Sequence, residues 1–160
     1  MTNSQVRQDL FVLSLIGDNG TFLDVGCCWP IKLNNTYLLE QHGWRGISID
    51  IDDYVNDWKC RTNPFIRADA LTFDFTVLEK YYDYLSLDIE KEGLRFKALQ
   101  RVVDAGIRFK VITIEHDAYC GYDLTERQPQ RKLLKSLGYT LIKPDVKSDG
   151  YEMEDWWVML

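Results

Sequence analysis

The chain has 160 residues, of which 46% are hydrophobic and 13% aromatic, and this predicts a single globular domain over residues 1–160. Its net charge of −6 argues against nucleic acid or an anionic membrane surface as a partner, because both would repel it. No secretory signal is expected at the N-terminus. The four cysteines form no Cys-x-x-Cys pair that would suggest zinc, so reduced thiols in a cytoplasmic protein are the simplest interpretation.

Short apolar runs alternate with longer mixed segments along the chain. Most of the runs are apolar on both faces, which is typical of a parallel sheet with helices on both sides. The runs predict strands at residues 21–25, 46–51, 65–68, 83–87 and 109–114. The mixed segments predict helices at residues 34–43, 52–61, 91–106 and 125–138, and three of these end at a glycine.

The C-terminal segment breaks this alternation. Two strand-like runs, at 139–143 and 155–160, follow each other with no helix between them, and residues 148–150 provide a Ser-Asp-Gly turn. We therefore predict an α/β fold with a doubly wound, mostly parallel seven-stranded sheet and an antiparallel C-terminal hairpin.

Acidic residues accompany the end of each predicted parallel strand. They are Asp24, then Asp50 and Asp52, then Asp69, then Asp88 and Glu90, and finally Glu115 and Asp117. One such acid is commonly a helix cap, but acids at five strand ends predict a negatively charged ligand site at the carboxyl edge of the sheet. NAD is disfavoured, because the first loop lacks the glycines of G-x-G-x-x-G. S-adenosylmethionine, with its sulfonium, its ammonium and its ribose diol, suits this edge better.

The sequence also resembles a known family at these positions. The segments "FLDVG", "NNTYLLEQHGWRGISID", "ADA", "YDYLSLDIEKE", "ITIEHDAY" and "EDWWV" occur in the order found in class I S-adenosylmethionine-dependent methyltransferases, and within them in the FkbM-like group. The resemblance spans nearly the whole chain. It implies a Rossmann-like methyltransferase fold with a C-terminal hairpin, and S-adenosylmethionine as the cofactor.

The resemblance assigns the loop after the first strand to the methionine part of the cofactor. Asp24 would lie near its amine, and Gly26 would let backbone N–H groups approach its carboxylate. Cys27 and Cys28 follow in this loop, where the family usually has further small residues. Cysteine can take the place of glycine there as long as φ is negative.

The remaining cofactor contacts implied by the resemblance follow the next three strands. Asp50, with Ile51 beside it, would accept hydrogen bonds from the ribose hydroxyls. Asp69 would meet the adenine amino group, and Ala70 would lie beside the ring. Asp88 would face the reacting methyl group.

A general base is needed if the methyl acceptor is a hydroxyl, because the pKa of a hydroxyl is far above neutral. His116 directly follows a predicted buried strand at the ligand edge, and we expect it to be this base. Glu115 and Asp88 are the alternatives.

The reaction that we expect is in-line transfer of a methyl group from S-adenosylmethionine to a hydroxyl. FkbM-like relatives imply a sugar-like acceptor, either a small molecule or a glycan, and a second subunit in a homodimer could complete the open acceptor site. Two alternatives stay open. One is a metal-dependent O-methyltransferase of a diol, in which Asp88 and Glu115 or Asp117 would hold a divalent cation. The other is a non-catalytic domain that only binds S-adenosylmethionine or a nucleotide.

Overall fold

The structure is a computed structural model, and it describes residues 2–160. Its helices are α1 (Gln8–Ile16), α2 (Tyr37–Gln41), α3 (Leu94–Asp104) and α4 (Gln128–Ser136). Its strands are β1 (Thr21–Val25), β2 (Arg45–Asp50), β3 (Phe65–Arg67), β4 (Tyr81–Leu87), β5 (Arg108–Glu115), β6 (Thr140–Ser148) and β7 (Tyr151–Val158).

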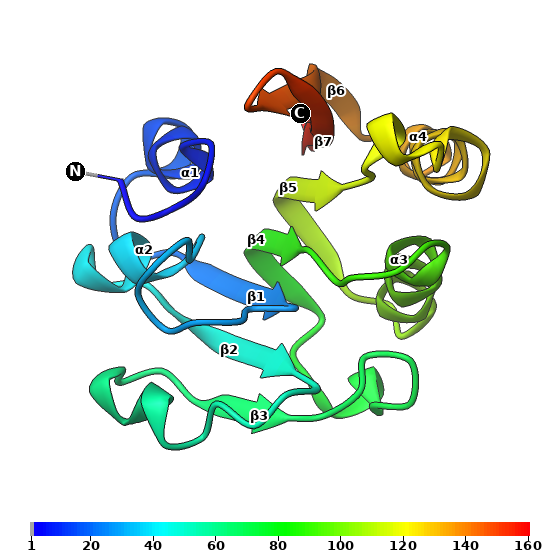
Figure 1. The fold of residues 1–160 in the computed structure, drawn as a ribbon. Helices are drawn as coiled ribbons and strands as arrows, with labels where there is room; N and C mark the ends of the chain where they lie inside the picture. Colours follow the sequence, from blue (N-terminus) through cyan, green and yellow to red (C-terminus); the bar gives the residue numbers. More distant parts are fainter. Residues whose placement is uncertain (1) are drawn as a thin grey trace.

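The strands form one sheet in the order β3-β2-β1-β4-β5-β7-β6. The first five strands are parallel to one another, and β7 pairs antiparallel with both β5 and β6. Helices α1 and α2 lie on one face of the sheet and helices α3 and α4 on the other (Figure 1). The predicted fold class is therefore confirmed, including the antiparallel hairpin.

Apolar side chains fill both interfaces between the sheet and its helices. On the α1 and α2 face, Val12, Phe22 and Trp44 are among the buried residues that pack together. On the opposite face, Leu99 of α3 and Trp157 of β7 belong to a larger buried cluster. The central strands β1, β4 and β5 therefore have apolar layers on both faces, and polar residues at the strand ends are left at the edge of the sheet.

The structure differs from the predicted elements in several places. Residues 52–61 contain only a short 3₁₀ turn, Asp57–Cys60, because aspartate side chains bond to nearby backbone N–H groups and compete with a helix. Helix α1 was not predicted from periodicity, since its apolar residues are spread around the helix instead of forming one stripe. The two hairpin strands are longer than predicted. A π-helical turn, Asp123–Arg127, precedes α4.

None of the helices among residues 2–160 combines the length and the apolar character that a membrane crossing requires.

Candidate functional site

The loop after β1 lies directly against the end of β4. Gly26 has φ of +81°, and a Cβ placed on it would lie 1.8 Å from the carbonyl oxygen of Asp88. Its N–H donates to the Ile49 carbonyl of β2, at 2.8 Å. Only glycine allows this close approach, so Gly26 is required where the ends of β1, β2 and β4 meet. Its predicted contact with the cofactor carboxylate stays a prediction.

Asp50 fixes the loops that follow β1 and β2. Its Oδ2 accepts a hydrogen bond from the Cys28 N–H at 2.9 Å, and its Oδ1 accepts one from the Asp52 N–H at 3.0 Å. Each carboxylate oxygen can accept a second bond, so Asp50 retains the capacity to bind a diol. Ile51 beside it is 62% exposed and free to contact a ligand.

The two cysteines of the first loop differ. Cys27 is buried, and burial raises the pKa of its thiol well above the ordinary value, so it is not a reactive thiolate. Cys28 is exposed and has φ of +50°. Cys28 therefore does not meet the condition of negative φ under which cysteine replaces glycine without strain, and the bond from its N–H to Asp50 offsets part of that strain.

Asp24 supports this loop from inside the protein. It is 2% exposed, and Thr36 Oγ1 donates a hydrogen bond to its Oδ2 at 2.9 Å. Burial raises the pKa of Asp24 to about 6, although the Thr36 and Ser86 hydroxyls partly offset this effect. The structure therefore places Asp24 beneath the proposed cofactor loop, with its carboxylate already bound by side chains of the protein.

Arg61, which the sequence gave no reason to single out, connects the loop to helix α2. Its guanidinium donates to Glu40 Oε2 at 2.6 Å and to the Pro30 carbonyl at 2.7 Å, and it also reaches Asn34 and Thr36. It lies over the Trp58 ring, 4.6 Å from the ring centroid. Arg61 therefore determines the path of the loop from residue 26 to residue 36.

Asp69 and Ala70 lie after β3, at the same edge of the sheet. Asp69 Oδ1 accepts the Leu71 N–H at 2.8 Å, and Ala70 is buried. The second carboxylate oxygen of Asp69 accepts no hydrogen bond within residues 2–160. This arrangement leaves one acceptor atom for the adenine amino group that the resemblance implies.

A pair of carboxyl groups lies where β4 and β5 end. Asp88 and Glu115 follow Leu87 and Ile114, which are paired in the parallel strands, so the two acids lie side by side within hydrogen-bonding reach. The guanidinium of Arg95 binds Glu115, and its charge also acts on Asp88. Arg95 comes from α3, is 3% exposed, and donates to Glu115 Oε2 at 2.6 Å and to Asp117 Oδ2 at 2.6 Å. Burial and the nearby Asp88 carboxyl raise the pKa of Glu115 to about 9, and burial also raises that of Asp88. Two carboxyl groups this close share one proton at neutral pH.

A third buried acid, Glu154 of β7, lies opposite Glu115 in the antiparallel ladder. Its Oε2 accepts a hydrogen bond from Gln8 of α1 at 3.0 Å, and its Oε1 accepts one from the indole of Trp156. Burial raises the pKa of Glu154 to about 8. Sequence reasoning missed this residue, because the last strand was predicted to begin at Asp155 and Glu154 lay outside it, whereas β7 begins at Tyr151.

Arg95 is held in place by a carboxylate at the N-terminus of its own helix. Glu126, 0% exposed, accepts the N–H groups of Arg95 and Phe96 at 3.2 and 2.8 Å. Gln130 Nε2 bonds to Glu126 Oε2 at 2.9 Å and to the Glu115 carbonyl at 3.0 Å. The turn before α4 therefore fixes both the start of α3 and the end of β5.

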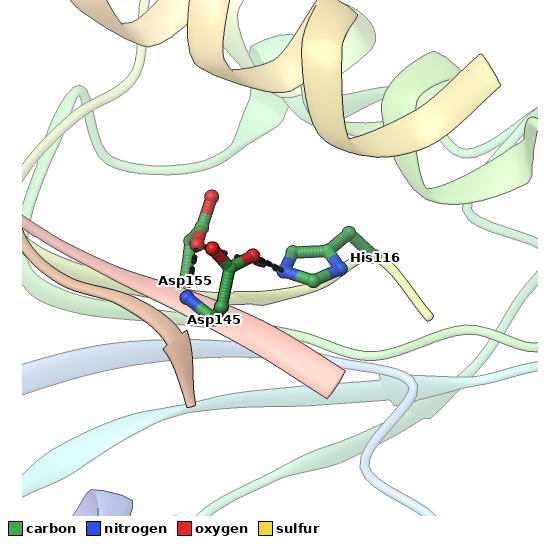
Figure 2. Close-up of side chains that lie close together, drawn as sticks. All are labelled: His116, Asp145 and Asp155. Carbon is green, nitrogen blue, oxygen red and sulfur yellow. Dashed lines mark hydrogen bonds and ion pairs between the residues drawn. The ribbon is translucent and has the colours of Figure 1, made fainter. Parts of the chain in front are cut away.

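His116 does not join this group of residues. It is 0% exposed, and its ring lies under α4 and faces Asp145 and Asp155 of the C-terminal hairpin with one nitrogen (Figure 2). Its Nδ1 accepts the Ala118 N–H at 3.1 Å, so the proton of the neutral ring is on Nε2, which points to Asp155 Oδ1 at 3.5 Å and Asp145 Oδ1 at 3.6 Å. Nδ1 is hydrogen-bonded inside the protein, and Nε2 is buried, faces two carboxylates of the hairpin and has no hydrogen-bond partner within residues 2–160. This geometry favours a structural role over the predicted base.

Metal binding does not fit either acidic group. At His116, a metal ion on Nε2 would require the proton on Nδ1, and Nδ1 already faces an N–H donor. The facing oxygens of Asp145 and Asp155 both accept hydrogen bonds from Arg131 Nη2, at 2.8 Å. At Glu115 and Asp117, the guanidinium of Arg95 occupies the position of a cation. We therefore derive no step through a metal ion.

The Gly26 contact predicts an asymmetric effect of alanine at two glycines. Gly26→Ala should lower the free energy of unfolding by roughly 3 kcal/mol or more, because its methyl group meets a backbone carbonyl. Gly93→Ala is the matched control: Gly93 also has positive φ, of +76°, but nothing lies within 4 Å of its Cβ position, so the cost should be only about 1–2 kcal/mol. Denaturant unfolding measures both, and equal losses would contradict the contact.

The buried Glu154 predicts a stability that falls as pH rises. Its folded pKa, about 8, lies above its ordinary value of 4.5, so the folded state retains a proton that the unfolded chain loses between these values. The free energy of unfolding of the Glu154→Gln variant, relative to that of the natural chain, should therefore increase between pH 5 and pH 9 by on the order of a few kcal/mol. The exposed Glu79, replaced by Gln, should show no such trend in the same unfolding curves.

The fold is shared with known methyltransferases. The magnesium protoporphyrin IX methyltransferase of Synechocystis PCC 6803, with bound SAM (S-adenosylmethionine), is 15% identical over 98% of this chain and 79% of its own, with a TM-score of 0.65. The 1,6-didemethyltoxoflavin-N1-methyltransferase of Burkholderia thailandensis, with bound 1,6-didemethyltoxoflavin and S-adenosylhomocysteine, gives 13% identity, 98% and 77% coverage and a TM-score of 0.62. An rRNA methylase of Streptococcus thermophilus is 13% identical over 100% of this chain and 99% of its own, with a TM-score of 0.58.

Neither a model of a protein family nor a curated protein matches the sequence. The FkbM-like assignment therefore stays a prediction. The chain has the Rossmann-like fold of class I S-adenosylmethionine-dependent methyltransferases.

Proposed function

We propose that this protein is an S-adenosylmethionine-dependent methyltransferase that methylates a hydroxyl group. The observation that carries the proposal is the position of its acids: a sheet with the strand order of this fold brings Asp50, Asp69 and the Asp88–Glu115 pair to one edge. In open α/β sheets, ligands bind at this edge. Solved structures of the same fold are described as methyltransferases with the cofactor or its product bound.

The residues at this edge fit S-adenosylmethionine. The Asp50 carboxylate can accept further hydrogen bonds from a ribose diol, and one oxygen of the Asp69 carboxylate can accept one from an amino group. Asn35, which follows the first loop, donates to Ser86 Oγ at 3.1 Å, and its buried Oδ1 has no partner within residues 2–160. An orphaned acceptor between the ends of β1 and β4 is suited to an ammonium group.

The chemistry requires an acceptor held in line with the methyl group and a base for its proton. S-adenosylmethionine, when bound, supplies an electrophilic methyl group on a sulfonium. With the cofactor bound, the Asp88–Glu115 pair would take the hydroxyl proton of the acceptor as the acceptor oxygen receives the methyl group. Arg95 Nη1, buried and without a partner within residues 2–160, is a spare donor beside this pair.

A sugar-like acceptor is the class that the FkbM-like resemblance implies. One feature of the edge supports it: Tyr119, after β5, and Tyr151, at the start of β7, lie with their ring centroids 5.1 Å apart. Both are about half exposed, at 52% and 58%. Exposed aromatic rings can cover the apolar face of a ring-shaped ligand while their hydroxyls remain wet. The edge is open, so a glycan end or a second subunit could also be accommodated.

S-adenosylhomocysteine should stabilise the folded protein, whereas NAD should not, because only a ligand that binds the folded state raises the melting temperature. Asp50→Ala should weaken S-adenosylhomocysteine binding by about 1.5–3 kcal/mol, the range for hydrogen bonds to a charged group. Asp52→Ala is the matched control, since the Asp52 side chain is exposed and should leave affinity near the natural value. Calorimetric titration reports both affinities, and an Asp50→Ala protein that binds normally would place the ribose elsewhere.

The base proposal predicts a selective loss of turnover. Glu115→Gln should slow methylation of a hydroxyl acceptor by ~10²–10⁴-fold while S-adenosylhomocysteine affinity changes little, because the lost interaction belongs to proton transfer. Transfer of labelled methyl from S-adenosylmethionine to a panel of sugars and glycans provides the assay. If the protein binds S-adenosylhomocysteine but methylates none of the panel, the non-catalytic binding alternative gains.

A further inference from the structure

The carboxyl pair at the ends of β4 and β5 lies next to the loop that the proposed function assigns to the cofactor. Asp88 touches this loop directly, since its carbonyl lies against the Cα of Gly26 and its N–H donates to the Val25 carbonyl at 2.9 Å. Glu115 lies beside Asp88, because both follow paired residues of the parallel strands β4 and β5, and it accepts a hydrogen bond from Arg95 at 2.6 Å. A change of charge on a ligand in this loop would therefore be felt by the pair.

Methyl transfer changes the charge of the ligand but conserves the charge of the site. With S-adenosylmethionine in this loop, a sulfonium of charge +1 would lie near the pair before transfer, and a neutral thioether would lie there afterwards. During transfer, the hydroxyl proton of the acceptor moves to the pair. A pair that is fully ionised beside the sulfonium and singly protonated beside the thioether keeps the same total charge before and after the reaction.

We propose that the Asp88–Glu115 pair distinguishes S-adenosylmethionine from S-adenosylhomocysteine by its proton: it releases its shared proton when the sulfonium binds and holds that proton when the product occupies the site. This inference rests on the proposed function. It adds that binding of S-adenosylmethionine makes the pair a base, because a pair that has released its shared proton can accept the hydroxyl proton of the methyl acceptor. It also assigns the preference for substrate over product to two named side chains.

The residues around the pair favour loss of its shared proton when a positively charged ligand arrives. Arg95 is ion-paired with Glu115 and with Asp117, so one guanidinium serves acids on both sides of the β5 end. Glu154 of β7, buried and opposite Glu115, adds a carboxyl without an ion-pair partner within residues 2–160. With Asp88, these acids outnumber the cation at this end of the sheet, so an arriving positive charge lowers the cost of ionising the pair.

The test is the ratio of two dissociation constants, Kd for S-adenosylhomocysteine divided by Kd for S-adenosylmethionine, measured by calorimetry from pH 6 to pH 8. The two ligands share their amino acid, ribose and adenine, so titrations of those groups and of distant residues cancel in the ratio. The site with S-adenosylmethionine holds one proton fewer, so raising the pH should favour S-adenosylmethionine. Because the proposal leaves the pair protonated with S-adenosylhomocysteine and ionised with S-adenosylmethionine across this range, the ratio should increase about tenfold for each pH unit.

The number of protons released on binding is a second test of the proposal, and it can be measured on the unmodified protein. Binding enthalpies of S-adenosylmethionine at pH 7.5 in phosphate and in Tris should differ by the ionisation enthalpy of about one released proton, whereas those of S-adenosylhomocysteine should agree between the two buffers.

Variants identify the residues responsible. Asp88→Asn and Glu115→Gln remove the shared proton in different ways, and either should make the ratio independent of pH while both ligands still bind. Glu90→Gln is the matched control, because Glu90 is an exposed acid on the same loop, and it should retain the full slope. Should one of the pair variants fail to fold, the other variant and the buffer comparison still decide.

The outcomes separate the two proposals. If neither ligand binds, the proposed function fails and this inference fails with it. If both bind and the ratio changes less than twofold between pH 6 and pH 8, with no proton released, the function stands and the inference is overturned. A tenfold slope that survives in both pair variants would also overturn it, since the proton would then come from another group.

Discussion

The guanidinium of Arg95 is the interaction on which the acidic edge depends. Parallel strands end at a common edge, and here that edge gathers Asp88, Glu115 and Asp117 close enough to repel one another if all are ionised. Arg95 binds two of them, and Glu126 holds the first turn of its helix in the position that this requires. Removing a buried cation of this kind leaves uncompensated carboxylates, which is generally far more costly than replacing the whole group by apolar residues. Arg95 therefore both stabilises the folded protein and sets the charge around the carboxyl groups at this edge.

Buried acidic residues on the two faces of the sheet differ in how they are stabilised. Alternation along β5 and β7 places Glu115 and Glu154 toward the α1 face, whereas His116 and Asp155 lie under α4. On the α4 side, Arg131 binds Asp155 in a two-pronged pair at 2.7 and 2.8 Å, and this holds the hairpin against α4. The acids beneath α4 are thus paired with arginines. Of the two toward α1, Glu115 is paired with Arg95 of α3, and Glu154 has its pKa raised by burial.

The sequence predicts the sheet well and the site in part. Apolar runs and glycine stops identify the parallel strands, and the order of acids places Asp50, Asp69 and Asp88 at one edge, because strand ends depend only on local pattern. His116 was assigned to that edge because it follows β5 directly, but the side-chain direction reverses with each residue and sends it to the opposite face. Arg61 and Arg95 act across long sequence separations, so no local pattern reveals their partners. Arg95 could have been noticed as a charged residue on the otherwise apolar side of α3, next to Ala98 and Leu99.

The hydrogen bonds of Asp50 have a consequence for ligand binding. Because Cys28 and Asp52 are already tied to its carboxylate, the loops after β1 and β2 are ordered in the free protein. Binding usually includes an entropic cost for immobilising loops, and preorganisation reduces that cost. The left-handed strain at Cys28 belongs to the folded state itself and is incurred when the chain folds, not when a ligand arrives. The binding site thus takes its shape from folding, and little conformational entropy remains to be lost in the encounter with a small molecule.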